Sequence, residues 1–196
     1  MSIAFSESKT KENLMRAFAG ESQARNRYTF AASQAKKEGL EAIAEIFLYT
    51  AGQEKEHAEI FYDFLKEMSG KSITVDGTYP VDLHANTTQL LRAAQHNEYQ
   101  EHDDVYPRFG DTAKEEEFPQ IANAFYQIAK IEKKHGDRFG ELADLLESGD
   151  LYTTEKSWIC LNCGYVHEGS GVPPQCPVCR HNQGYFIPSR LAPYQV

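Results

Sequence analysis

The chain has 196 residues, of which 41% are hydrophobic and 25% are charged, a composition typical of soluble globular proteins and sufficient for a helical core. The formal net charge of −9 argues against a nucleic-acid partner, because such partners require basic surfaces. No apolar run approaches the ~20 residues that cross a bilayer, which argues against a membrane protein. The N-terminal residues 1–11 are polar and lack the apolar part of a signal peptide, so we expect a cytoplasmic location.

Four long helices are expected in the N-terminal part, where Ala, Leu, Glu, Lys and Gln recur with helical period. We expect the first over 10–37 with Thr10 as its N-cap, the second over 40–68, the third from Asn86 or Thr87, and the fourth from Pro119 to just before Gly149. The polar stretch over 71–85 is expected to be an extended connection.

The lengths of the connections between these helices predict the topology. A helix of about 28 residues is about 42 Å long, and 15 extended residues span up to about 50 Å. The connection over 71–85 can therefore run along the whole bundle, whereas the link between the first two helices permits only a hairpin. We predict an all-α, ferritin-like four-helix bundle with one long crossover.

The chain changes character near residues 148–154. All four cysteines lie between Cys160 and Cys179, and prolines and glycines replace the helix-forming residues there. We therefore predict two domains, the helical bundle over 1–150 and a small four-cysteine domain over 151–196.

Carboxylates and imidazoles interrupt the apolar stripe of every predicted helix near its middle, as Glu54 does between Phe47 and Phe61. Any one such residue alone is better explained as a register-setting polar residue or as a side chain that reaches the surface. Seven together would bury five unpaired carboxylates, which costs many kcal/mol, so a cation is expected among them. The seven residues are Glu21, Glu54, His57, Glu98, Glu101, Glu132 and His135.

Two Glu-x-x-His motifs indicate the kind of cation. Glu54 and His57, and likewise Glu132 and His135, lie one helical turn apart on one face. The first and third helices each add an inward-facing Glu. This is the ligand pattern of carboxylate-bridged di-iron and di-manganese bundles.

The two halves of the predicted bundle repeat each other with a shift of 78 residues. The matching pairs are Tyr28 with Tyr106, Phe47 with Phe125, Glu54 with Glu132, His57 with His135 and Phe61 with Phe139. The repeat fails once, because Glu21 falls on Glu98 with a shift of 77, so the third helix has one additional residue before Tyr106. We predict a π-bulge there, with Glu101 as an additional ligand that makes the two metal positions unequal.

Cys160-x-x-Cys163 and Cys176-Pro-Val-Cys179 have the spacing of two metal-binding knuckles around a tetrahedral all-thiolate site. A structural zinc ribbon has the same ligands and is the commoner occurrence on spacing alone, whereas disulfides are disfavoured in the cytoplasm. A redox-active metal pair in the same chain favours iron, because it gives a one-electron site a role.

Over nearly its whole length the chain resembles the rubrerythrin family. The resemblance rests on Gly20-Glu21, Glu54-Lys-Glu-His57, Glu98-x-x-Glu101, Glu132-Lys-Lys-His135 and the Cys160 to Cys179 motif, in that order. It implies a ferritin-like di-iron domain followed by a rubredoxin-like domain. The seven bundle residues would bind the iron pair, and a single iron would be bound by Cys160, Cys163, Cys176 and Cys179.

The resemblance also implies an activity and partners. It implies a peroxidase that reduces hydrogen peroxide to water in defence against oxidative stress, with electrons relayed one at a time through the four-cysteine iron. An upstream electron-donor protein or an NAD(P)H-dependent reductase would supply them, and a homodimer would pair the cysteine domain of one subunit with the iron pair of the other. His57 and Glu101 would exchange as ligands. Tyr28 and Tyr106 would hydrogen-bond ligand carboxylates, although packing explains buried tyrosines equally well.

Two other functions fit parts of the pattern. A ferroxidase or iron-storage protein uses the same bundle with dioxygen as oxidant, but it needs no electron-entry domain. A non-catalytic electron carrier would keep the cysteine site and use the bundle metal for structure alone. The relative rates with peroxide and dioxygen separate the first alternative, and the effect of Glu54→Ala on turnover separates the second.

Overall fold

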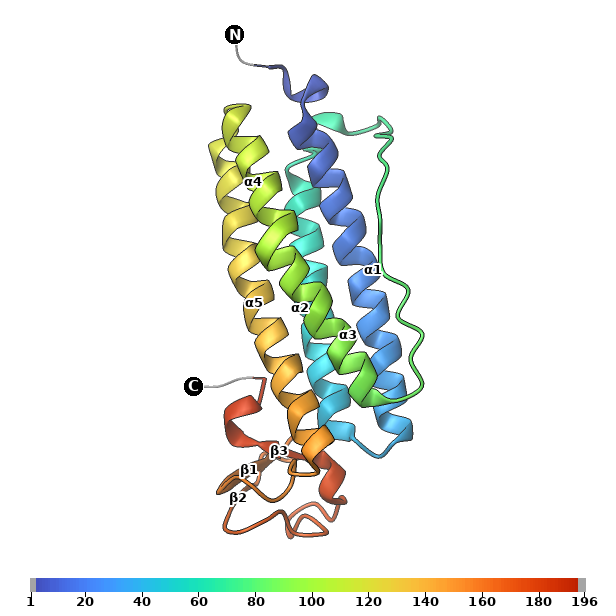
Figure 1. Ribbon diagram of the computed structural model, residues 1–196, viewed down its shortest axis with the longest axis vertical. Coiled ribbons are helices and arrows are strands. Elements are labelled where there is room, and N and C mark those ends of the chain that lie inside the picture. The colour runs from blue at the N-terminus through green and yellow to red at the C-terminus, as the bar shows by residue number, and fades with distance from the viewer. Residues whose placement is uncertain (1–2, 194–196) are drawn as a thin grey trace.

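The computed structural model describes residues 3–193 as a bundle of long helices with a small three-stranded domain at one end (Figure 1). The helices are α1 (Lys9–Lys37), α2 (Glu41–Asp63), α3 (Thr87–Gln100), a π-helix (Glu101–Val105), α4 (Tyr106–Glu115) and α5 (Pro119–Ser148). The strands are β1 (Ser157–Cys160), β2 (Val166–Glu168) and β3 (Phe186–Pro188). Single 3₁₀ turns cover Phe5–Glu7, Lys66–Met68, Gln183–Tyr185 and Ser189–Leu191. The predicted fold class is confirmed.

Three helix ends lie where their local sequence predicts them. The Asn86 side chain accepts a hydrogen bond from the Gln89 N–H and so caps α3. Pro119 opens α5, where a missing N–H does no harm. Gly149 ends α5 in the left-handed conformation, with φ 78°.

Two other ends differ from the prediction. The N-cap of α1 is Ser8 and not Thr10, because the Ser8 side chain accepts a hydrogen bond from the Lys11 N–H. Thr10 is already helical, and its hydroxyl donates to Glu116 instead. The second predicted helix does not run unbroken to residue 68: α2 ends at Asp63, and the chain then tightens into a 3₁₀ turn.

The third predicted helix consists of α3, the π-helix and α4 in direct succession. A residue inserted into a helix is accommodated by one widened turn, after which the normal helical face resumes. Tyr106, the first residue after the π-helix, is therefore as fully buried as Tyr28 in α1. The predicted π-bulge is confirmed.

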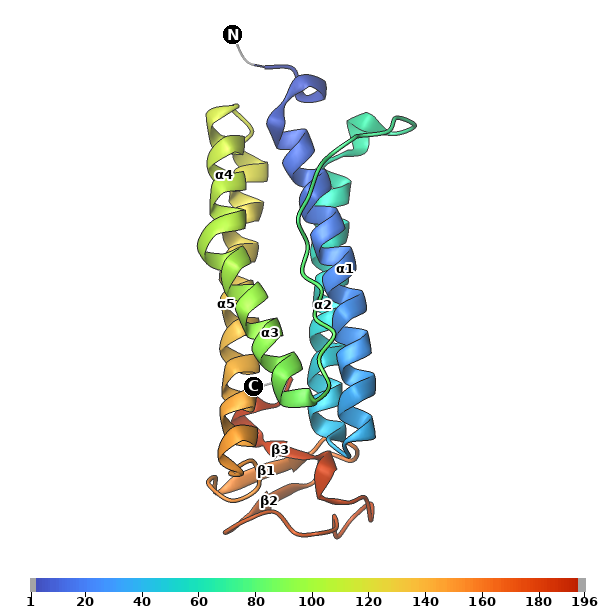
Figure 2. The ribbon, with the colours of Figure 1, turned by 45° about the vertical axis from the view of Figure 1, so that its right-hand side comes forward.

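The segment over 71–85 crosses the bundle from end to end alongside α1 (Figures 1 and 2). It is tied to α1 at several points. Arg16 donates hydrogen bonds to the carbonyl and carboxylate of Asp76, and Tyr79 Oη donates to the Arg16 carbonyl. Arg27 pairs with Asp82 at 2.8 Å. The long crossover predicted from connection lengths is confirmed.

Two aromatic clusters pack the bundle core and reproduce the 78-residue repeat in space. The first contains Tyr28, Phe47 and Phe139, with ring centroids 5.1 to 6.1 Å apart. The second contains their counterparts Tyr106, Phe125 and Phe61, with centroids 4.9 to 5.9 Å apart. The two clusters belong to separate apolar cores, and both exclude water from the bundle.

The small domain is a sheet in the order β2-β1-β3, with β1 antiparallel to both neighbours. It rests on one end of the bundle, where Ile187 and Leu191 join the apolar core that contains Phe139. Arg190 adds ion pairs with Glu141 of α5 and with Glu155. Within residues 3–193, no helix combines the length and apolar character needed to cross a membrane.

Candidate metal centres

Helices α1, α2, α3 and α5 bring six of the seven predicted residues together in two overlapping groups. In each group, one carboxylate oxygen or ring nitrogen from every residue lies within 4.8 Å of the others. All six residues are buried. Glu54 and Glu132 belong to both groups, as bridging carboxylates would. The first group is Glu21, Glu54, His57 and Glu132, and the second is Glu54, Glu98, Glu132 and His135.

The contacts within these groups follow a pseudo-twofold relation. His57 Nδ1 lies 3.0 Å from Glu54 Oε2 and 3.0 Å from Glu132 Oε1. His135 Nδ1 lies 2.9 Å from Glu132 Oε2 and 3.1 Å from Glu54 Oε1. Each ring therefore faces the glutamate of its own helix and the equivalent glutamate of the other helix.

Two tyrosines extend this relation outward. Tyr28 Oη donates a hydrogen bond to Glu98, and Tyr106 Oη donates one to Glu21. Each tyrosine thus holds a carboxylate from the opposite half of the bundle. A buried phenol that fixes one carboxylate oxygen leaves the other oxygen oriented toward the middle of the cluster.

Several buried atoms of the cluster lack any hydrogen-bond partner. They are Glu21 Oε2, Glu54 Oε1, Glu98 Oε2, both carboxylate oxygens of Glu132, and His135 Nδ1. Buried acceptors that converge without a donor are costly unless a cation lies among them. Carboxylate oxygens and imidazole nitrogens are ligands that suit iron, so the residues present fit a pair of such ions.

The charges of the cluster also require positive compensation. Burial and the charges of Glu132 and Glu54 raise the pKa of Glu21 well above its usual value, and burial together with Glu54 raises the pKa of Glu98 to about 8. Burial would raise the pKa of Glu54 too, but the facing imidazoles outweigh it and lower that pKa to about 2. Carboxylates in this cluster therefore ionise together only when positive charge lies between them.

Glu101, the seventh predicted residue, lies outside both groups at the start of the π-helix. It lines a cleft of about 630 Å³ between α1, the crossover and the π-helix. A Cβ at Gly20 would lie 4.0 Å from Glu101 Oε1, so the glycine keeps space beside this carboxylate. Burial raises the pKa of Glu101 well above its usual value, and so do the charges of Glu98, Glu132 and Glu54, so Glu101 lies close to the cluster although it belongs to neither group.

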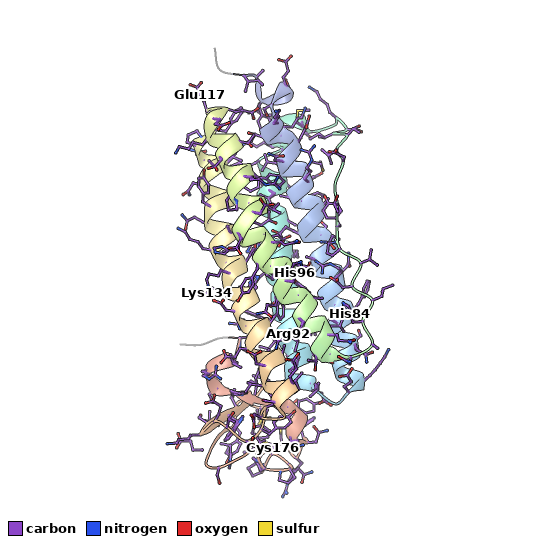
Figure 3. The ribbon with its side chains drawn as sticks, viewed as in Figure 1. His84, Arg92, His96, Glu117, Lys134 and Cys176 are labelled. Atoms are coloured by element: carbon purple, nitrogen blue, oxygen red, sulfur yellow. The ribbon has the colours of Figure 1, made fainter. Side chains whose placement is uncertain are left out.

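The four cysteines form a second cluster, in the small domain at the end of the bundle where Figure 3 labels Cys176. The Sγ atoms of Cys160 and Cys179 are 3.7 Å apart, as are those of Cys163 and Cys176. A tetrahedron with metal–sulfur bonds of about 2.3 Å has edges of about 3.8 Å, whereas a disulfide bond is about 2.05 Å long. The main-chain N–H of His181 helps to lower the pKa of the Cys179 thiol to about 6, which favours a thiolate. The cluster fits one tetrahedral metal ion.

Comparison with known proteins covers both parts of the chain. A family model described as rubrerythrin matches residues 12–143, and one described as the rubredoxin-like domain of rubrerythrin matches residues 158–187. The chain belongs to the rubrerythrin family. It is 48% identical to a rubrerythrin of Porphyromonas gingivalis over 93% of this chain and 91% of that protein. It is 47% identical to a rubrerythrin of Clostridium perfringens over 91% of this chain and 93% of that protein. A solved structure of nigerythrin in a mixed-valence state has a TM-score of 0.62 and 28% identity, and covers 92% of this chain and 89% of that one.

Membership of the rubrerythrin family identifies the metals. The protein is a non-haem di-iron protein with a rubredoxin-like domain, and the predicted iron cofactors are confirmed. The choice between iron and structural zinc at the cysteines, which spacing alone left open, is thereby decided for iron.

Two features of the di-iron cluster were not predicted. The first is a hydrogen bond that Gln53 Oε1 accepts from His135 Nε2 at 2.9 Å. In the sequence, Gln53 stands out only because the 78-residue repeat pairs this polar residue with the apolar Ile131. The second is Gly136, which lies inside the fourth predicted helix although glycine is unfavourable there, and the sequence alone does not explain its presence. A Cβ there would lie 2.7 Å from the Tyr99 ring, so the glycine allows α3 to approach α5 closely beside His135.

Proposed function

We propose that this protein is a rubrerythrin-type peroxidase that reduces hydrogen peroxide to water and protects the cell from oxidative stress. The observation that carries the proposal is the presence, in one chain, of a buried two-metal carboxylate cluster and a four-cysteine iron site. A two-electron reduction at a buried centre needs replacement electrons, and an all-thiolate iron is suited to deliver them singly.

In this proposal each predicted ligand has a role. Glu54 and Glu132 would hold both metals, because each belongs to both groups. When bound, the iron pair supplies the two electrons that cleave the O–O bond of peroxide. Its ligands are Glu21, Glu54, His57, Glu98, Glu101, Glu132 and His135, and those of the single iron are Cys160, Cys163, Cys176 and Cys179.

The chain itself admits the substrate from one side. The cleft beside Glu101 is lined by polar and charged groups, including Arg27 and Asn97, which suits a small polar molecule. His57 belongs to the first group, and Glu101 lines the cleft. We propose that these two side chains exchange as ligands with the redox state of one iron. Tyr28 and Tyr106 keep the remaining carboxylates oriented while this happens.

The separation of the two clusters within one chain supports a dimer. From His135 to Ser148, α5 rises about 20 Å, and the cysteines lie beyond its end (Figure 3). We propose a homodimer in which the cysteine domain of one subunit serves the iron pair of the other. In this proposal the domains divide near residue 150, an electron-donor protein or an NAD(P)H-dependent reductase reduces the cysteine iron, and the protein acts in the cytoplasm.

Stopped-flow mixing of the full-length di-ferrous protein with hydrogen peroxide or with dioxygen tests this function. We expect much faster oxidation by peroxide. We also expect Glu54→Ala to abolish turnover, because both metal positions lose a ligand. Glu56→Ala is the matched control, since Glu56 lies on the same helix, is 65% exposed and pairs with Lys55.

The contrary outcomes identify the rival functions. Faster oxidation by dioxygen than by peroxide would indicate a ferroxidase or iron-storage protein. Intact peroxide turnover in the Glu54→Ala variant would indicate an electron carrier whose bundle metal is structural.

A further inference from the structure

The two histidines of the di-iron cluster differ in how their outer ring nitrogens are held. His135 Nε2 lies 2.9 Å from Gln53 Oε1. An amide oxygen only accepts hydrogen bonds, so His135 Nε2 carries the proton and donates it, which leaves the Nδ1 lone pair directed at the carboxylates. Within residues 3–193, no hydrogen bond to His57 Nε2 is formed by any side chain or main-chain group.

This difference breaks a symmetry that the rest of the cluster obeys. The contacts of both rings with Glu54 and Glu132 are equivalent, and so are the hydrogen bonds of the two tyrosines. By the same 78-residue relation, the counterpart of Gln53 is Ile131. An isoleucine side chain has no atom that accepts a hydrogen bond, so it cannot tether His57 as Gln53 tethers His135.

The residues around Gln53 are polar, whereas the residues at the repeat-related positions around Ile131 do not provide the same polar contacts. Gln53 Nε2 donates to Tyr49 Oη at 3.4 Å, and the Arg138 guanidinium lies over the Tyr49 ring, 5.7 Å from its centroid. These contacts orient the amide with its oxygen toward His135. The counterpart of Arg138 is Ile60, which, like Ile131, is an apolar and partly exposed side chain.

We propose that Gln53 is a positioning residue that fixes the His135 ring, and that the isoleucine at the equivalent position leaves the His57 ring free to move. This inference rests on the proposed role of both rings as iron ligands. A metal-bound imidazole is normally held by a hydrogen bond from its other nitrogen, and a ring without that bond leaves its metal more readily. The untethered ring belongs to the first group together with Glu21, and Glu101 Oε1 would lie 4.0 Å from a Cβ at Gly20, the residue before Glu21. The π-helix and the missing tether therefore act on the same metal position.

Hydrogen exchange of the ring N–H groups tests the tether directly. The probe is full-length protein with isotope-labelled histidine, loaded with zinc at both sites so that no redox change occurs, and observed by NMR. We expect the Nε2 proton of His135 to exchange more slowly than that of His57. Gln53→Leu should accelerate exchange at His135 about fivefold, the effect of losing one ordinary hydrogen bond, and should leave His57 unchanged. Gln53→Glu, which keeps an acceptor oxygen, should retain the protection.

The reciprocal variant tests the symmetry argument. Ile131→Gln should slow exchange at His57 and should reduce movement of that ring between crystal structures of the oxidised and reduced iron protein. Gln127→Leu, a substitution on the same helix at the counterpart of Tyr49, is the control and should change neither ring.

Equal exchange at His135 in the parent protein and in Gln53→Leu would overturn the proposal. So would unchanged exchange at His57 in Ile131→Gln, or a His135 ring that moves as far as His57 between the two redox states. Because the zinc protein has no peroxidase activity, failure of the tether is distinguishable from failure of the proposed function.

Discussion

The two hairpins of the bundle, α1–α2 and α3–α5, are arranged in the same way but differ in residues around the two metal positions. Ser8 caps α1, and Asn86, one position after the counterpart of Ser8 under the 77-residue shift, caps α3 in the same way. Glu116, which follows α4, accepts hydrogen bonds from the first N–H groups of α1, and its counterpart Glu38 accepts one from Thr87 at the start of α3. Each hairpin therefore caps the first helix of the other.

Two differences between the hairpins bear on the metal positions. One hairpin has the π-helix, which carries Glu101 to the edge of the cleft. The other has Gln53, which holds His135, opposite an isoleucine that leaves His57 without a hydrogen bond from its side chain. In our proposal, a nearly symmetric pair of hairpins thus holds the two histidines unequally, because a few residues around the metal positions differ between the hairpins.

Metal stoichiometry provides the test with the largest expected effect. Glu132→Ala should lose both bundle metals, because Glu132 belongs to both groups, whereas Glu21→Ala should keep one metal, because Glu21 belongs to the first group only. Elemental analysis of zinc-loaded protein, corrected for the single ion at the cysteines, measures the difference. One retained bundle metal in Glu132→Ala, or none in Glu21→Ala, would show that the two positions do not share ligands in this way.

Deletion of Asp103 should have the next largest effect. It removes the additional residue of the π-helix and keeps all seven predicted ligand residues in the sequence. Asp103 is 72% exposed within the π-helix, and its removal gives Glu98 and Tyr106 the same spacing as Glu21 and Tyr28. We expect both bundle metals to remain bound. Peroxide turnover should fall about 100-fold, the usual effect of displacing a reacting group by about 1 Å, because Glu101 is carried away from its place.

Asp103→Ala, which preserves the length of the segment, is the control for this deletion and should keep parental turnover. Both rates are measured on iron-loaded protein under steady-state conditions with hydrogen peroxide. Parental turnover in the deletion variant would mean that the π-helix has no part in the reaction.

The sequence predicted those parts of the protein that depend on local or periodic signals. The polar residues on the apolar stripes identified the six residues that the structure brings together. The single misfit between Glu21 and Glu98 in the repeat predicted the π-helix, and Asn86, Pro119 and Gly149 marked three helix ends correctly. Each of these signals lies within one helix or follows from the repeat of two.

The features that were missed depend on contacts between residues far apart in the chain. The hydroxyl of Thr10 is occupied by Glu116, 106 positions later, so local propensity could not show that Ser8 is the cap. Gln53 reaches His135 across 82 positions, and as a polar residue beside the stripe it has the same signature as a solvated side chain. Only the comparison of Gln53 with Ile131 distinguishes it.

The smallest predicted effect concerns Glu116 and Glu38, each of which caps the first helix of the other hairpin. It tests whether the two caps contribute equally to stability. Glu116 accepts hydrogen bonds from Lys9 N, Thr10 N and Thr10 Oγ1, whereas Glu38 accepts from Thr87 N and from Gln34 Nε2. Glu116→Gln should lower the free energy of unfolding by about 1 kcal/mol at neutral pH, and Glu38→Gln by less, because fewer charge-assisted bonds are lost.

The pH dependence of this effect follows from the pKa of Glu116. Partial burial would raise that pKa, but the hydrogen bonds from Thr10 and Lys9 outweigh burial and hold it below the usual value of 4.5. A carboxylate whose pKa is lower in the folded state stabilises the fold above its usual pKa, and this contribution is lost as the pH falls through the lowered value. Urea denaturation at neutral and acid pH should therefore show the difference between the parent and Glu116→Gln shrinking below about pH 4. The neighbouring exposed Glu115, changed to Gln, is the control, and a difference for Glu116→Gln that stays constant with pH would exclude a role for the charge.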